Sequence, residues 1–249
     1  MCIRDRGGFY PIIDGYVLPA SPFVIFEENK QHKVPVLLGS NADEGTLVHK
    51  MFPTPMIEFR YQSMVKGMLP SIFYEEFAEE ATALLKLYPG LENRKEKAEM
   101  DFIGDDMFGS KVRFYAEKIA QSNQASFFYF FNRTPPSSKQ WAGAFHGSEL
   151  PFVHGKSVPI LPLNKADRKL STTMINYWTQ FAKTGNPNGN AQPEWTSFDP
   201  NNPQWMILGT KKVGMETVER EEKYSLLMVR LNRYIQAMKK LKETATELL

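Results

Sequence analysis

Short, unbroken apolar runs alternate along this chain with longer stretches in which apolar residues recur every three or four positions. Val34–Leu38 and Phe127–Phe131 are runs of the first kind, and Trp205–Leu208 is a shorter third. Strands that are covered on both faces of a parallel sheet read as continuous apolar runs, whereas half-exposed strands alternate. The pattern therefore predicts three buried strands.

Amphipathic helices are predicted at residues 72–88, 105–121 and 170–181, where apolar side chains recur at helical spacing. The first is closed by Pro89-Gly90 and the last by Gly185-Asn186-Pro187, both of which are stop signals. Residues 185–203 are rich in Asn and Pro and are expected to form a surface loop held down by Trp195. This alternation of strands and helices is typical of an α/β layer architecture.

The C-terminal stretch carries a heptad-like stripe at Leu227, Leu231, Tyr234, Met238, Leu241, Ala245 and Leu248. The stripe predicts an amphipathic helix over residues 226–249, which either docks on its own domain or mediates a dimer. A basic helix lying on a membrane surface is a weaker third interpretation. If the dimer hypothesis is wrong, truncation after Ser225 leaves the oligomeric state unchanged.

Composition narrows the classes of partner. The net charge is only +2, from 30 Lys and Arg against 28 Asp and Glu, and the small dispersed excess argues against nucleic acid. No apolar run approaches the roughly 18 residues of a membrane span, and no signal peptide is readable, so localisation stays open. Cys2 is the single cysteine, which excludes an intrachain disulfide.

Candidate chemistry lies in two motifs, Asn41–Gly45 and Phe145–Pro151. Glu44 follows the first predicted strand, at the carboxyl edge of the sheet where α/β folds place their ligands. His146 lies in a loop after the second strand, and an acid followed by a histidine is the α/β-hydrolase order of Ser, Asp or Glu, and His. On spacing alone, a solvated loop acid or a helix N-cap is the commoner interpretation of Glu44. Asp43 is expected to satisfy backbone donors in its turn.

The other histidines are weaker candidates for a general base. His32 sits in a polar cluster and is expected at the surface, His49 on a helix face near the acid, and His154 at a position where an aromatic residue is expected. No two histidines have a spacing with cysteines or carboxylates that indicates a metal site.

The motifs resemble those of the type-B carboxylesterases, the family of the cholinesterases and bacterial para-nitrobenzyl esterases. The matching segments follow in family order and cover most of residues 7–225: Phe9–Gly15, Leu18–Pro19, Val34–Gly45, Asp105–Phe108, Phe128–Phe131, His146–Val153 and Asn176–Pro187. The resemblance implies an α/β-hydrolase fold, of which this chain forms the C-terminal half of a single domain. Residues 1–6 match nothing in the family and are expected to be a non-native leader or an ordinary disordered N-terminus.

The resemblance also implies roles for individual residues. Glu44 corresponds to the triad acid and His146 to the general base, with no cofactor, in a serine esterase that hydrolyses a small-molecule carboxylic ester through an acyl-enzyme. Glu149 corresponds to a glutamate that supports the active-site loops, although a solvated glutamate is nearly as frequent at such a position. Asp105 or Asp106 is interpreted as structural.

The nucleophile motif of this family is missing from the sequence. No Gly-x-Ser-x-Gly occurs in the 249 residues, and Gly155-Lys156-Ser157 lacks the second glycine. The family's Gly-rich oxyanion loop is also absent. We therefore expect an esterase fragment that is inactive by itself. We also expect it to be poorly soluble, because it exposes sheet edges and apolar faces. The alternative is a non-catalytic, cholinesterase-like binding or adhesion protein; a self-sufficient small hydrolase is a weaker third option.

Overall fold

A computed structural model describes residues 12–51, 77–93, 95–137, 141–159, 161–189 and 192–247. Contacts divide the described chain into two units, residues 33–231 on the one hand and residues 12–32 with 232–247 on the other. The expected leader at residues 1–6 and the start of the helix expected at residues 72–88 lie outside the described residues.

The larger unit is built on a four-stranded sheet with the order β1-β2-β3-β4. β1 (Val36–Asn41), β2 (Ser126–Phe131) and β3 (Gln204–Leu208) are parallel to one another, and β4 (Val213–Thr217) is antiparallel to β3. The three predicted strands are present, and β2 and β3 are buried as expected. β1 begins two residues later than expected and is only partly buried over its first four residues. β4 escaped prediction because it is short, half exposed and interrupted by Gly214.

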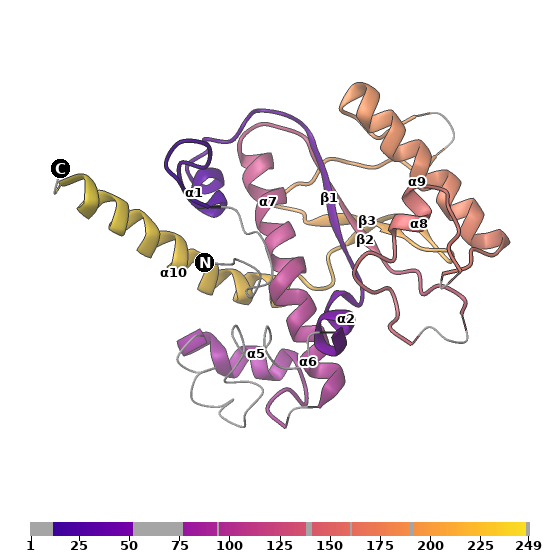
Figure 1. The fold of residues 1–249 in the computed structure, drawn as a ribbon, viewed down its shortest axis with the longest axis horizontal. Coiled ribbons are helices and arrows are strands. Elements are labelled where there is room, and N and C mark those ends of the chain that lie inside the picture. The colour runs from indigo at the N-terminus through magenta and orange to yellow at the C-terminus, as the bar shows by residue number, and fades with distance from the viewer. Residues whose placement is uncertain are drawn as a thin grey trace, which may run out of the picture. The chain divides into compact units, whose positions relative to one another are not determined.

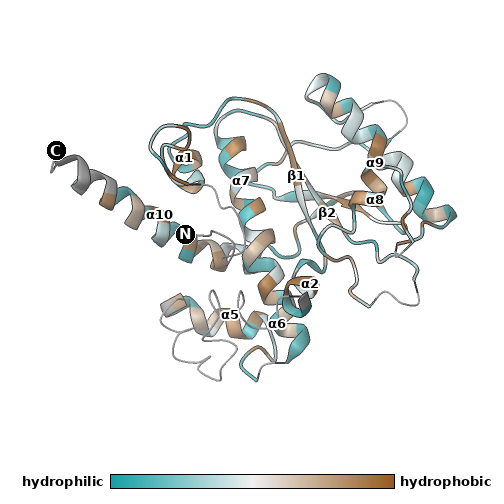
Figure 2. Cartoon of the chain, in the orientation of Figure 1, coloured by the Kyte–Doolittle hydropathy of each residue, from teal (hydrophilic) through white to brown (hydrophobic). Residues whose placement is uncertain are grey.

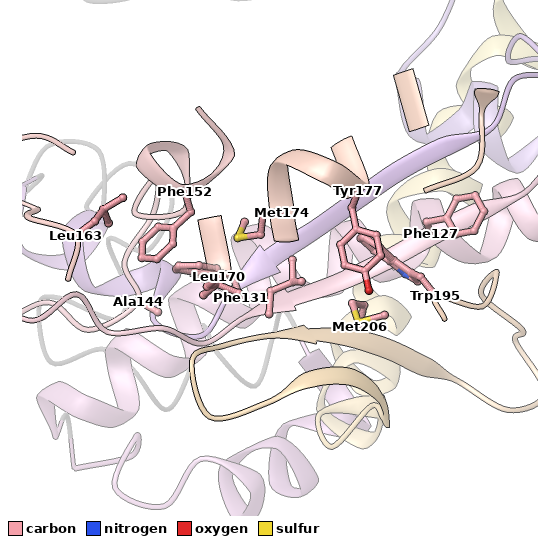
Figure 3. Close-up of a cluster of buried hydrophobic side chains, with 11 residues drawn as sticks. Phe127, Phe131, Ala144, Phe152, Leu163, Leu170, Met174, Tyr177, Trp195 and Met206 are labelled. Carbon is pink, nitrogen blue, oxygen red and sulfur yellow. The ribbon is translucent and has the colours of Figure 1, made fainter. Parts of the chain in front are cut away.

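Alternate residues of β2 and β3 fill two separate cores, as the period of a strand requires. One face of the sheet meets α8 (Leu150–Val153) and α9 (Lys165–Thr184), and Figure 3 shows the cluster that they form. The opposite face meets α7 (Ser110–Gln121). The result is a three-layer α/β/α arrangement whose helices show apolar stripes (Figure 2). The two buried clusters consist mainly of Phe127, Phe131, Phe152, Leu170, Met174, Tyr177, Trp195, Met206 and Leu208 on the first face, and of Ala116, Phe128, Phe130, Trp205, Ile207 and Tyr224 on the second.

Before α7 the chain is helical over a longer span than the sequence predicts. α6 (Glu96–Gly104) continues through a π-helical turn, η3 (Asp105–Gly109), into α7 (Figure 1). The helix predicted at residues 105–121 therefore begins inside a π turn. α7 buries Phe114, Ala116 and Ile119, and the partly buried Val112 packs against the cluster that contains Ala116. Tyr115 is only partly buried.

The remaining helices agree with the sequence pattern more closely. α5 (Ala81–Leu87), with the 3₁₀ turn η2 (Ala78–Glu80) before it, buries Ala81 and Leu84 as expected. α9 begins with a capping box of Asn164 and Asp167 and ends at Gly185, whose φ of 74° closes the helix. In the following loop, the buried Trp195 is bonded through its backbone to the side chain of Asn188.

The C-terminal helix, α10 (Glu221–Glu247), crosses from the larger unit into the smaller one, which also contains α1 (Pro22–Glu27). Leu227 and Leu231 are buried within the larger unit, whereas Leu241 is 64% exposed. None of the described helices is both long and apolar enough to cross a bilayer. The dimer hypothesis for residues 226–249 stays a prediction.

Candidate functional site

Glu44 is the first residue of α2 (Glu44–Met51), which starts directly after the turn that follows β1. Its carboxylate is buried and its two oxygens have different partners. Oε1 accepts the backbone N–H of Asn41 at 2.8 Å, and Oε2 lies 2.7 Å from Nδ1 of His146. The structure thus brings together the acid and the histidine singled out in the sequence, which are 102 residues apart.

The loop that carries His146 lies against the Glu44 turn through backbone contacts. Asp43 donates its N–H to the carbonyl of Ala144 at 3.0 Å and accepts the N–H of Ala144 on Oδ2 at 2.8 Å. Asp43 therefore satisfies a backbone donor, as expected, but in the histidine loop rather than in its own turn. Gly143 has a φ of 71°, and a Cβ there would lie 2.2 Å from Asp43 Oδ2, so a side chain at this position would be strained and would displace the Asp43 carboxylate.

The imidazole of His146 is partly open to solvent, with 56% of its side chain exposed. One face packs on Phe108, with 4.6 Å between the ring centroids and 34° between the planes. The hydrogen bond to Glu44 raises the pKa of His146 above its usual 6.5, against a smaller opposing effect of burial. In the neutral ring, this contact assigns the proton to Nδ1 and leaves Nε2 as a proton acceptor, the tautomer that a general base needs.

Glu149 lies three residues beyond His146 and contacts the end of β1. Its Oε2 accepts the side-chain amide of Asn41 at 2.5 Å instead of a backbone N–H. The same amide nitrogen donates to the carbonyl of Phe145 at 2.9 Å. Glu149 is thus connected to the acid turn through Asn41.

The π turn η3 contains two buried aspartates, Asp105 and Asp106. Asp105 pairs with Arg220 at 2.6 Å and accepts the hydroxyl of Tyr88 at 2.9 Å. Arg220 also donates to the carbonyl of Ala42, inside the turn that carries Glu44, at 3.0 Å. These contacts agree with the structural interpretation of Asp105, and they tie the acid turn to the helical layer.

Asp106 is buried beside Asp105 and is bound from two other elements. Arg230 of α10 reaches its carboxylate at 2.6 Å, and Lys111 of α7 lies 3.2 Å from it. These ion pairs give Asp106 a structural environment as well.

The other three histidines lie apart from this arrangement. His49 lies on α2, as expected, and its Nε2 is 2.9 Å from Glu99 of α6. His32 and His154 are exposed. Within the part of the chain that the structure describes, no group of three His, Cys, Asp or Glu residues is arranged to hold a metal ion.

Sequence reasoning missed three residues that shape the site: Asn41, Phe108 and Arg220. Asn41 and Phe108 lie inside segments that were singled out, but no local signal shows what their side chains contact. Arg220 lies 178 residues from Ala42, and only the fold brings the two together.

An acid–histidine pair beyond the carboxyl ends of parallel strands, in a three-layer α/β/α unit, is the arrangement of an α/β-hydrolase. The carboxylesterase family profile matches residues 4–227, so the chain belongs to the carboxylesterase family.

Individual relatives agree with this assignment. The acetylcholinesterase of Leptinotarsa decemlineata is 28% identical over 82% of this chain and 34% of its own length. For carboxylesterase 1C of Mus musculus the identity is 28%, over 76% of this chain and 36% of the relative. Among solved structures, a PNB esterase superposes with a TM-score of 0.68 at 25% identity, over 88% of this chain and 43% of the esterase. The chain thus spans less than half the length of these relatives.

Proposed function

We propose that this chain supplies the acid and the general base of a serine carboxylic-ester hydrolase, and that the serine and the oxyanion donors lie in sequence beyond these 249 residues. The observation that carries the proposal is the 2.7 Å contact between Glu44 Oε2 and His146 Nδ1, in a histidine whose side chain is 56% exposed to solvent. Membership of the carboxylesterase family and the likeness to a PNB esterase support ester hydrolysis as the reaction.

In this mechanism the serine attacks the ester carbonyl while His146 takes its proton on Nε2. Glu44 holds the Nδ1–H and stabilises the imidazolium that forms. His146 then delivers the proton to the departing alcohol, and water attacks the acyl-enzyme by the same route. The substrate is a small-molecule ester, and no step requires a cofactor.

The second candidate is a non-catalytic binding protein on the same fold. The sequence supports it only through the missing nucleophile motif, since Gly-x-Ser-x-Gly is absent from this chain. The buried acid held against the histidine favours the enzyme, because a binding protein has no need of a buried carboxylate on an imidazole.

The test is to express this chain joined to its own upstream coding sequence and to measure hydrolysis of a p-nitrophenyl ester and labelling by a fluorophosphonate. We expect both in the joined protein and neither in the 249-residue chain alone. His146→Gln and Glu44→Gln should each lower kcat by roughly 10⁴-fold or more, since the triad acts as a unit.

The chain offers a matched control in its second histidine–glutamate pair. His49→Gln removes a histidine that contacts Glu99 at 2.9 Å but lies outside the proposed triad. The proposal requires that His49→Gln retain activity. Equal losses in the His49 and His146 variants, or hydrolysis by the joined protein that His146→Gln leaves intact, would contradict it.

A further inference from the structure

Asn41, the last residue of β1, contacts the acid Glu44 and the loop that carries His146. Its backbone N–H donates to Glu44 Oε1 at 2.8 Å, and its side-chain amide donates to the carbonyl of Phe145 at 2.9 Å. Phe145 directly precedes His146. Asn41 therefore binds the Glu44 oxygen that does not contact His146, and it also binds the backbone next to His146.

The orientation of this amide is fixed by its partners. Nδ2 faces two oxygens, the carbonyl of Phe145 and Oε2 of Glu149, neither of which can donate a hydrogen bond when the carboxylate is ionised. A flipped amide would place Oδ1 against both oxygens. Asn41 is only 3% exposed, so water does not replace a lost partner.

The histidine loop also makes a contact within itself and contacts to Asp43. The carbonyl of Phe145 accepts the N–H of Ser148 at 2.9 Å. Asp43 binds Ala144, which lies two residues before the histidine, and forms a parallel bridge with Phe145. Asn41 adds a contact from the end of β1 to Phe145, directly before His146, and to Glu149, three residues after it.

We propose that Asn41 is a positioning residue that sets the distance between Glu44 and His146 by tying the histidine loop to the end of β1. Glu149 acts in this arrangement as the second acceptor that orients the Asn41 amide. The inference rests on the proposed function, because the geometry it maintains matters for catalysis only if Glu44 and His146 act as acid and base.

The experiment follows the titration of His146 by NMR, with ring-labelled histidine, in this chain joined to its own upstream coding sequence. His146→Gln assigns the resonance. Glu44→Gln measures the effect of losing the acid and should lower the His146 pKa toward the usual histidine value. Asn41→Leu keeps the approximate volume and the neutral charge of Asn41 but removes both side-chain bonds, and it should lower the pKa in the same direction by a smaller amount.

Ser40→Ala is the matched control. It removes a buried hydroxyl from the adjacent residue, whose side chain points to the opposite face of β1. The proposal predicts an unchanged His146 titration in this variant. A loss of thermal stability without a change in the titration would assign Asn41→Leu a merely structural effect and overturn the proposal.

If Asn41→Leu does not fold, Asn41→Val replaces it. Valine suits a strand end and carries no donor, so a fall in the His146 pKa supports the proposal and an unchanged pKa overturns it. The experiment can refute the acid–base pair and the role of Asn41 independently. An unchanged titration in Glu44→Gln refutes the acid–base pair itself, whereas a response to Glu44→Gln with none to the Asn41 variants refutes only the role of Asn41.

Discussion

Gly45 allows α2 to approach α6 closely, and Gly45→Ala should separate the two helices. A Cβ at Gly45 would lie 2.0 Å from the carbonyl oxygen of Met100 and 2.7 Å from the backbone nitrogen of Gly104, where real contacts are no shorter than about 3.0 Å. The atoms are therefore at least 1.0 Å too close (3.0 − 2.0), and both neighbours are backbone of α6, which cannot rotate away. The acid Glu44 is the adjacent residue and moves with Gly45.

The change in the free energy of unfolding of Gly45→Ala is the sum of two opposing effects. Overpacking of this kind costs about 1–3 kcal/mol. A Gly-to-Ala change recovers about 0.4–1 kcal/mol by restricting the unfolded chain. Because the clash is with backbone, we expect the upper part of the range and a net loss of about 2 kcal/mol in the free energy of unfolding.

Urea unfolding of this chain joined to its own upstream coding sequence measures this loss, with Gly189→Ala as the matched control. A Cβ at Gly189 meets Gln180 at an ordinary 3.7 Å, so that variant should stay within about 0.5 kcal/mol of wild type. If Gly45→Ala is as stable as Gly189→Ala, the close approach of α2 and α6 is wrong.

Three further expectations concern other parts of the molecule. Asp105→Asn leaves the Arg220 guanidinium without its buried counter-charge and should cost about 3–5 kcal/mol of unfolding free energy; a loss below about 1 kcal/mol in urea unfolding contradicts this account. Because the pKa of His146 is raised in the folded state, the stabilisation by Glu44 is fully present below pH 6.5 and is lost as the pH rises through the folded-state pKa. The stability difference between wild type and Glu44→Gln should therefore shrink with rising pH across that interval, and a difference that grows refutes the assignment. Leu241 is 64% exposed on α10, so under the dimer hypothesis wild type sediments as a dimer and Leu241→Glu as a monomer, while equal masses contradict a helix-mediated dimer.

The sequence predicted the fold best where the apolar pattern of a segment matches its burial in the structure. Phe127–Phe131 is apolar on both faces because it lies between two helical layers, and its neighbour β3 follows the same rule. α6 was missed because its first turns are largely charged and its buried residues, Ala98, Phe102, Ile103 and Gly104, do not form a long apolar repeat. The π turn at Asp105 also left no local signal, since buried ion pairs with residues far along the chain accompany it.

Some residues of the candidate site could be predicted from the sequence and others could not. The motif residues Glu44 and His146 could be chosen from the sequence, because their order and surroundings resemble a known family. The contacts of Asn41 could not, because its side-chain partners are 104 and 108 residues away. The stacking of Phe108 on His146 also depends on the phase of the π turn, which changes where each side chain of that helix points.

The most direct test of the central claim is to read the coding sequence upstream of Gly7 far enough to cover the length that the relatives have and this chain lacks. The account predicts an in-frame Gly-x-Ser-x-Gly motif and a Gly-rich oxyanion loop. The motif would supply the serine that completes a triad with Glu44 and His146. Another residue at the serine position, or no continuation upstream, would contradict catalysis and favour the binding protein.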